Sequence, residues 1–131
     1  MTPELIALAL SALLQIVQFA FYAVPANKEL GTRYTMSSRD QEPEREMSEI
    51  TARQRRAFEN HFEGLILFGI AVGIVQMSGQ NSMFTAICAW VYLIARIGYV
   101  PAYVFGWNPA RSYIWFFGFI ATVSLLIAAL L

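Results

Sequence analysis

The chain has 131 residues, of which 57% are hydrophobic, and a mean hydropathy of +0.50, which is outside the usual range of a soluble domain. Nine basic and nine acidic residues give a formal net charge of zero, which argues against a nucleic-acid partner. The length fits one compact unit, residues 1–131, and is too short for two ordinary domains. The single cysteine, Cys88, excludes an internal disulfide and a cysteine-based metal cluster, so we expect no metal site.

The first apolar segment, residues 5–24, carries no charge and is long enough to cross a hydrocarbon core of about 30 Å. It has no basic start and no small-residue cleavage site. We therefore interpret it as a retained membrane span, at about residues 4–25, and not as a signal peptide. Pro25 is expected to end its helix. The polar segment that follows, residues 26–47, is expected to be a partly ordered loop.

The second span begins inside a charged segment, residues 53–63, which runs into an apolar run without any turn signal. This pattern predicts one helix for residues 48–78, roughly 15 Å longer than the hydrocarbon core. Arg56, Asn60 and Glu63 are spaced i, i+4, i+7 and share one face of this helix. Polar side chains that enter a bilayer are costly unless they bind something, so this face is a candidate functional site.

Two more spans follow, at residues 82–106 and 109–131, which completes an all-α membrane protein with four transmembrane helices. Asn108 and Pro109 form a start signal for the fourth helix. Asn108 is predicted to cap the free amides, and Pro109 suits the first helical position.

The distribution of charge predicts the orientation in the membrane. Seven of the nine basic residues lie between Lys28 and Arg56, so the loop at 26–47 is expected to be cytoplasmic and both termini to lie on the opposite side. In a bacterium the membrane would be the inner membrane. Polar side chains of three spans then meet near the cytoplasmic face: Arg56, Asn60, Glu63, Arg96, Tyr103 and Arg111.

Two arginines outside the second span invite specific hypotheses. Arg96 is predicted to pair with Glu63 across helices, because the two opposite charges lie at a similar depth; a snorkelling arginine is the alternative. Arg111 falls in the first turn of the fourth helix. Unpaired amides, the helix dipole and a guanidinium would there favour an anion such as a thiolate, whereas the simpler interpretation is a flanking positive charge.

The spacing of these residues resembles a known family. Arg53-x-x-Arg56-Ala57-x-x-Asn60-x-x-Glu63 is similar to the signature of the MAPEG proteins, the membrane-associated proteins in eicosanoid and glutathione metabolism. Arg96 with Tyr103, and Arg111 with Ser112, resemble the third and fourth helices of that family. The resemblance covers essentially the whole chain and points to bacterial-type members similar to microsomal glutathione transferases. Trp115 departs from it, since some members have a tyrosine there.

The resemblance implies a homotrimer that binds glutathione as a co-substrate between neighbouring subunits, near the cytoplasmic face. A lipophilic electrophile or hydroperoxide would enter from the membrane lipid. Arg111 would stabilise the thiolate, and Ser112 would donate a hydrogen bond to the sulfur. Glutathione itself would be held by Arg56, Asn60, Glu63, Arg96 and Tyr103, with Lys28 and Asp40 as candidates from the end of the first span and the loop.

Three functions were therefore compared. The first is a membrane glutathione transferase with peroxidase-like activity. The alternative is a non-catalytic lipid-binding or scaffold protein on the same fold, which Trp115 favours and Arg111 disfavours. The third is a small multidrug exporter, but such exporters rely on a carboxylate in the first span, and residues 5–24 contain none.

Overall fold

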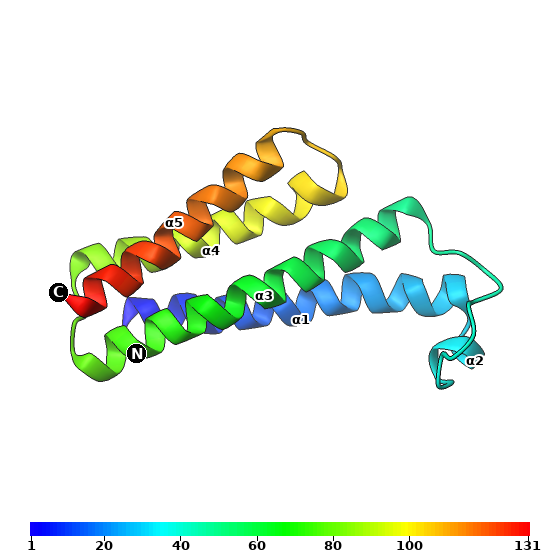
Figure 1. Cartoon of the computed structure of the whole chain (residues 1–131), viewed down its shortest axis with the longest axis horizontal. Helices are drawn as coiled ribbons and strands as arrows, with labels where there is room; N and C mark the ends of the chain where they lie inside the picture. The colour runs from blue at the N-terminus through cyan, green and yellow to red at the C-terminus, as the bar shows by residue number, and fades with distance from the viewer.

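The computed structural model describes every residue from Met1 to Leu131. Four helices are long and apolar enough to cross a membrane, and they are α1 (Pro3–Leu30), α3 (Glu49–Ser78), α4 (Met83–Val104) and α5 (Ala110–Leu130). A single short helix, α2 (Thr32–Thr35), lies in the loop between α1 and α3. The long helices run antiparallel in succession, so both chain ends lie at one end of the bundle (Figure 1). The predicted all-α membrane protein with a four-helix bundle is confirmed.

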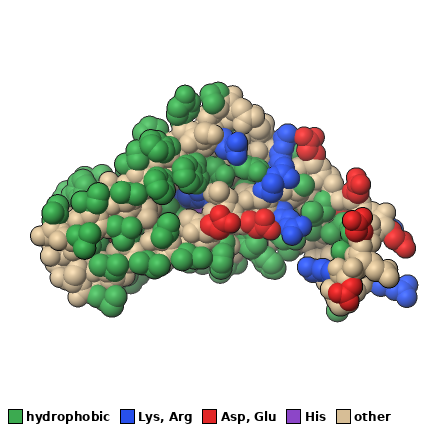
Figure 2. All heavy atoms as spheres, viewed as in Figure 1, with side chains coloured by type: hydrophobic (Ala, Val, Ile, Leu, Met, Phe, Trp, Pro, Cys, Tyr) green, Lys and Arg blue, Asp and Glu red, His purple; other side chains and the backbone are tan.

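We call the end of the bundle that carries the chain termini the termini end, and the opposite end, with the α1–α3 and α4–α5 connections, the loop end. Figure 2 shows hydrophobic side chains over most of the termini end, and charged side chains gathered toward the loop end. Many large apolar side chains of all four long helices are exposed, among them Ile16, Ile70 and Ile94. Such a surface suits lipid, and the chain is an integral multi-pass membrane protein.

The helix α3 starts where the sequence predicts. Ser48 is the N-cap, and its hydroxyl accepts a hydrogen bond from the amide of Thr51 at 3.2 Å. Glu29, near the end of α1, accepts from the amide of Ser48 at 2.7 Å and from the hydroxyl of Thr51. One carboxylate therefore fixes the start of α3 against the end of α1, and the two helices leave the loop as an antiparallel pair.

The prediction that Pro25 ends the first helix is wrong, because α1 continues to Leu30. A proline removes one amide donor, but the turns around it keep theirs, and the side chain of Asn27 donates to the carbonyl of Ala23 at 2.8 Å. The helix stops at Gly31, whose φ of 86° is accessible to glycine. The polar segment after the apolar run is therefore helical for about another turn and a half.

The start of α5 also differs from the prediction. Pro109 occupies the N-cap position, and no side chain caps the helix, so the expected cap by Asn108 is wrong. The amide of Arg111 donates to the carbonyl of Trp107 at 2.9 Å, and that of Ser112 to the carbonyl of Pro109 at 3.0 Å. The chain already turns before the helix, so backbone carbonyls reach these amides. They are not free for an anion, contrary to the prediction for this helix start.

The hydrophobic core lies toward the termini end and draws on all four long helices. Phe68 and Val72 of α3 and Leu125 of α5 are fully buried, and the ring of Tyr92 of α4 stacks on that of Phe68 with centroids 3.8 Å apart. The helix α3 packs against α1, α4 and α5, whereas α1 and α5 do not touch. Because α3 is central, its side chains can reach every other helix.

Polar contacts close the termini end. Ser82 and Thr85 form a capping box at the start of α4. The hydroxyl of Thr85 donates to Oε1 of the buried Glu4 at 2.6 Å, which joins α4 to α1. The hydroxyl of Thr2 donates to Oε1 of Gln76 at 2.8 Å, which joins the N-terminus to the end of α3.

Candidate functional site

Arg96 of α4 is the buried cation of this bundle, with 2% of its surface exposed. Its Nη1 donates to Oδ1 of Asn60 at 3.0 Å, and its Nε donates to Nδ1 of His61 at 3.3 Å. The guanidinium carbon lies 4.4 Å from the centre of the Tyr99 ring. The predicted ion pair with Glu63 is wrong: Glu63 is exposed and forms no ion pair, because the amide and imidazole one turn earlier on α3 take the guanidinium instead.

His61 is fully buried between α1, α3 and α4. Its Nε2 lies 2.9 Å from the carbonyl oxygen of Ser11 in α1. Because the Nε of Arg96 can only donate, Nδ1 of His61 must accept, so the ring proton is on Nε2 and is donated to Ser11. His61 therefore holds Arg96 in place and joins α3 to α1, a structural role that the sequence did not reveal.

A second set of contacts lies closer to the loop end, around Tyr103 of α4. The Nε of Arg56 in α3 donates to the hydroxyl of Tyr103 at 2.9 Å. The guanidinium carbon of Arg111 in α5 lies 4.9 Å from the centre of the same ring, which is a cation–π distance. The ring centres of Tyr99 and Tyr103 are 5.7 Å apart. We call Arg56, Arg96, Arg111, Tyr99 and Tyr103 the arginine–tyrosine cluster.

Tyr99 was missed by sequence reasoning, although a signal was present. Arg96, Tyr99 and Tyr103 are spaced i, i+3, i+7 and therefore share a face of α4. Once Arg96 is placed against α3, the same face brings Tyr99 to the guanidinium of Arg96 and Tyr103 to Arg56. The helix α5 then adds Arg111 from the other side, so three helices contribute to the cluster.

None of the arginines in the cluster has a carboxylate partner. The two ion pairs of the chain are Arg53 with Glu49 at 2.8 Å and Arg55 with Glu59 at 3.1 Å, both one turn apart on α3. Arg56 is exposed and Arg111 is half-buried, so the cost of a buried charge without a counter-ion, several kcal/mol in general, falls on Arg96. The cluster is therefore suited to an anionic ligand.

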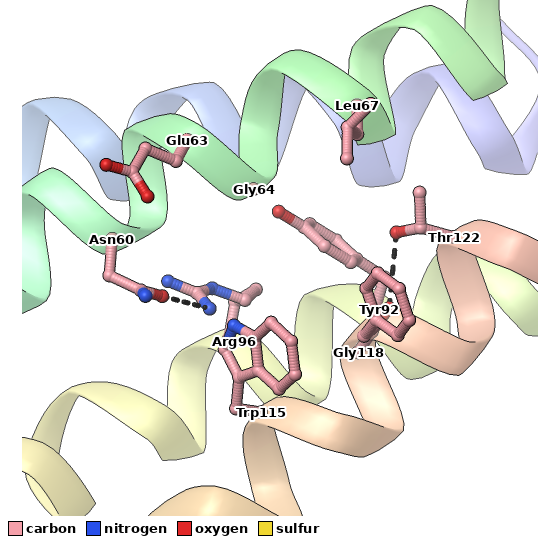
Figure 3. Close-up of a pocket in the computed structure, with 10 residues that line it drawn as sticks. Asn60, Glu63, Gly64, Leu67, Tyr92, Arg96, Trp115, Gly118 and Thr122 are labelled. Carbon is pink, nitrogen blue, oxygen red and sulfur yellow. Dashed lines mark hydrogen bonds between the residues drawn. The ribbon is translucent and has the colours of Figure 1, made fainter.

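A cavity of about 200 Å³ adjoins the cluster between α3, α4 and α5 (Figure 3). Two donors that line it have no partner, Nη2 of Arg96 and the hydroxyl of Tyr92, and both residues are at least 97% buried. The Tyr92 hydroxyl points toward α3 at Gly64, where a Cβ atom would lie 3.2 Å from its oxygen. A glycine at this position keeps the space above the hydroxyl open.

The walls of the cavity differ in polarity. Asn60 and Glu63 of α3 lie near Arg96 at one end, whereas Leu67, Trp115 and Phe119 make the cavity apolar elsewhere. The rings of Trp115 and Phe119 stack with centroids 5.2 Å apart. Such a site can hold a polar group next to the cluster and an apolar group against the aromatic wall.

The remaining predicted site residues, Ser112, Lys28 and Asp40, are exposed. Ser112 is exposed in the first turn of α5, next to Arg111, and its hydroxyl makes no hydrogen bond within the chain. Lys28 is exposed in the last turn of α1. Asp40 is exposed in the loop, where it accepts from the hydroxyl of Ser38 at 2.9 Å. Lys28 and Asp40 do not contact the cluster within one chain, so their predicted roles are not supported by this geometry alone.

The comparisons with known proteins agree with the signature on α3 and α4. The sequence profile of the MAPEG family matches residues 6–131, which is nearly the whole chain. No curated protein and no solved structure matches it. The family match and the four membrane-spanning helices indicate a membrane protein of glutathione or eicosanoid metabolism. The family suspected from the spacing of Arg56, Asn60, Glu63 and Arg96 is thus confirmed, and the chain belongs to the MAPEG family.

Proposed function

We propose that this protein is an integral-membrane glutathione transferase that activates the glutathione thiol for attack on a lipophilic electrophile or hydroperoxide. The observation that carries the proposal is the arginine–tyrosine cluster, whose arginines lack any carboxylate partner in the chain. The cluster adjoins a cavity that continues along apolar walls. An anionic tripeptide beside a lipophilic substrate would use both parts of this site.

The charges of glutathione complement those of the cluster. Glutathione has two carboxylates, one α-amino group and a thiol. Guanidinium groups such as those of Arg56 and Arg96 bind carboxylates in a planar, bidentate geometry. Glu63 has no ion-pair partner and is available for the α-amino group. Asn60 and Tyr103 would add hydrogen bonds, so the charged groups of glutathione have counterparts among the polar side chains near the cavity.

In the proposed mechanism Arg111 stabilises the thiolate by its charge. The thiol proton leaves to water, and the sulfur forms a bond to the electrophilic carbon while the leaving group departs with its electron pair. The hydroxyl of Ser112 donates to the sulfur. Because the amides of Arg111 and Ser112 already bond to carbonyls, activation of the thiol rests mainly on the guanidinium and not on the helix start. Leu67, Trp115 and Phe119 would hold the apolar part of the second substrate.

A hydroperoxide would react at the same site by a different bond change. The thiolate attacks the terminal oxygen, the O–O bond breaks, and the alcohol leaves after it takes up a proton. A second glutathione then reduces the sulfenic acid on the first, which gives glutathione disulfide and water. The substrate has to be lipophilic in both reactions, because the aromatic wall faces the apolar part of the bundle.

A homotrimer with a cytoplasmic loop end completes the proposal. Lys28 and Asp40 are exposed at the loop end and away from the cluster of their own chain, so they are free to reach the site of a neighbouring subunit. The basic residues of the α1–α3 connection favour the cytoplasmic side for this end. Glutathione would then enter from the cytoplasm and the second substrate from the lipid.

The test is the conjugation of glutathione to 1-chloro-2,4-dinitrobenzene by the purified protein in detergent. Arg111→Ala should lower kcat by roughly 100-fold or more, the usual effect of removing a group that stabilises developing charge. The dissociation constant of glutathione should change only a few-fold. Arg39→Ala is the matched control, since Arg39 bonds the carbonyl of Thr35 in the loop, away from the cluster. Equal kcat in the wild-type protein and Arg111→Ala would contradict the mechanism.

A non-catalytic lipid-binding or scaffold function on the same fold is the second candidate. Two observations favour it, namely Trp115 in the wall of the cavity and the occupied amides at the start of α5. A scaffold protein would show no glutathione-dependent product in the same assay, although it would still bind a lipophilic ligand. The conjugation assay therefore separates the two functions.

A further inference from the structure

A second cavity, which we call the glutamine groove, lies at the loop end between α1, α3 and α4. It has a volume of about 270 Å³ and is lined by Gln18 and Phe21 of α1, Gln54 of α3, and Val100, Pro101, Val104 and Phe105 at the end of α4. No residue that lines it also lines the cavity beside Arg96. The groove is thus a separate site, formed against α1 and not against α5.

Two side-chain amides in this groove have polar atoms without partners. Gln18 is 97% buried, and neither its Oε1 nor its Nε2 makes a hydrogen bond. The Oε1 of Gln54 is also buried and without a partner. Buried amide atoms are hydrogen-bonded in most proteins, so each of these needs an explanation. A ligand that satisfies them has to donate to an amide oxygen and accept from an amide nitrogen.

A hydroxyl head group meets this requirement with a single atom. A hydroxyl donates through its hydrogen and accepts through its oxygen, so it can satisfy both kinds of amide atom. An ester or an ether only accepts and would leave both glutamine oxygens unpaired. A carboxylate also only accepts, and the two uncharged amides offer it no positive charge. Among lipid head groups, an alcohol is therefore the best match.

The rest of the groove fits an apolar chain. Its other lining residues include Phe21, Val100, Pro101 and Phe105. Phe21 and Phe105 are 57% and 63% exposed, so the groove opens on the apolar outer surface of the bundle. Gln54 follows Arg53, which donates to the carbonyl of Val104 at 3.2 Å. The groove therefore runs from the charged end of α3 to the apolar part of α1.

From these observations we infer that the glutamine groove binds a membrane alcohol, an amphiphile with a hydroxyl head and an unbranched apolar chain, of the class of the monoacylglycerols and long-chain alcohols. The hydroxyl donates to a glutamine oxygen and accepts from the Nε2 of Gln18. The apolar chain lies between α1 and α4 and leaves the groove past Phe21. The inference needs neither glutathione nor the cluster, so it can fail or hold independently of the proposed function.

The experiment compares 1-dodecanol with dodecyl methyl ether, which has the same chain but cannot donate. Thermal unfolding of the purified protein in detergent is followed by a fluorogenic maleimide that reacts with Cys88, which is buried in the folded protein. Dodecanol should raise the unfolding midpoint by about 3 °C near saturation, and the ether should raise it by much less. An equal shift with the ether would overturn the inference, because the apolar chain alone would then explain binding.

Variants of the glutamines test the site itself. Gln18→Leu should raise the half-saturating concentration of dodecanol roughly tenfold, since it removes the Nε2 that donates to the hydroxyl. Gln15→Leu, one turn away on α1 and outside the groove, should leave it unchanged. If Gln18→Leu does not fold, Gln54→Leu replaces it, and the half-saturating concentration of dodecanol should rise in that variant too. An unchanged dodecanol response in the groove variants overturns the inference. A change in the oligomeric mass of these variants also overturns it, because the groove would then be a contact between subunits.

Discussion

The two ends of the bundle treat their polar side chains in opposite ways. At the termini end Ser82 and Thr85 cap the start of α4, Thr85 donates to one carboxylate oxygen of Glu4, and Thr2 donates to Gln76, so that only the second oxygen of Glu4 has no partner there. At the loop end three arginines gather around two tyrosines without any carboxylate partner. Polar groups that only hold helices together can be satisfied within the chain. Those left without partners next to a cavity indicate where a ligand belongs.

The difference is also visible in how the helices separate. Toward the loop end of Figure 1, the α4–α5 pair diverges from the α1–α3 pair, whereas the pairs lie closer at the termini end. The cavity beside Arg96 is formed by α3, α4 and α5. The termini end thus acts as the closed base of the bundle, and the loop end as the part that a ligand can complete. The predictions below separate these roles.

The largest expected effect concerns stabilisation by glutathione. Glutathione at about 100 times its dissociation constant should raise the free energy of unfolding of the wild-type protein by about 2.7 kcal/mol. Arg96→Met removes the buried cation and should abolish this increase. Denaturant titration with and without glutathione gives both values. A variant that gains as much from glutathione as the wild-type protein would show that Arg96 does not contribute to the site.

The next effect belongs to the closed end. Thr85→Val removes the hydroxyl that donates to one carboxylate oxygen of Glu4. The other oxygen has no partner in the wild-type protein, so the variant leaves the carboxylate without any donor. The free energy of unfolding should fall by about 2 kcal/mol, because a buried carboxylate is left without a donor. The dissociation constant of glutathione should not change, as the residue is far from the cluster. A weakened affinity in this variant would mean that the two ends are coupled.

A smaller effect is expected at Tyr103. Tyr103→Phe keeps the ring under Arg111 but removes the hydroxyl that accepts from Arg56. The loss of one hydrogen bond to a charged group should raise the dissociation constant of glutathione about fivefold, or about 1 kcal/mol. Calorimetric titration measures this dissociation constant. Tyr113→Phe, at an exposed position of α5, serves as the control and should bind normally.

The smallest effect is predicted for the free hydroxyl in the cavity. Tyr92→Phe removes an oxygen that has no partner in the chain and keeps the stack on Phe68. The free energy of unfolding without ligand should therefore change by less than about 0.5 kcal/mol. A loss above about 1 kcal/mol would show that the hydroxyl is bonded in the folded protein, which is incompatible with a role in ligand binding.

Much of the fold could be predicted from the sequence, because uncharged runs of twenty residues leave few alternatives in a chain of this length. The start of α3 near Ser48 was predicted, whereas its role as the N-cap is shown by the structure. The end of α1 was mispredicted at Pro25, because the preference of proline for helix ends does not take account of the hydrogen bonds in the neighbouring turns. The start of α5 was mispredicted because backbone carbonyls, which carry no sequence signal, took the amides that Asn108 was expected to cap.

The candidate site was predictable where residues share one helical face and not where partners lie on another helix. Arg56 and Asn60 were identified by their spacing on α3. The partner of Arg96 was not, because charge alone favoured Glu63, whereas the packing of α3 against α1 and α4 places His61 and Asn60 at the guanidinium. Tertiary packing, which a helical wheel omits, determines which of several neighbouring residues on α3 contacts Arg96.

We propose that the unpaired arginines of the loop end hold glutathione as its thiolate. The direct measurement is the ultraviolet absorbance of the thiolate of bound glutathione as a function of pH. A free cysteine thiol has a pKa of about 8.5, and the pKa of bound glutathione should lie well below this value in the wild-type protein and return toward it in Arg111→Ala. A thiol that titrates like free glutathione in the wild-type protein would contradict the account.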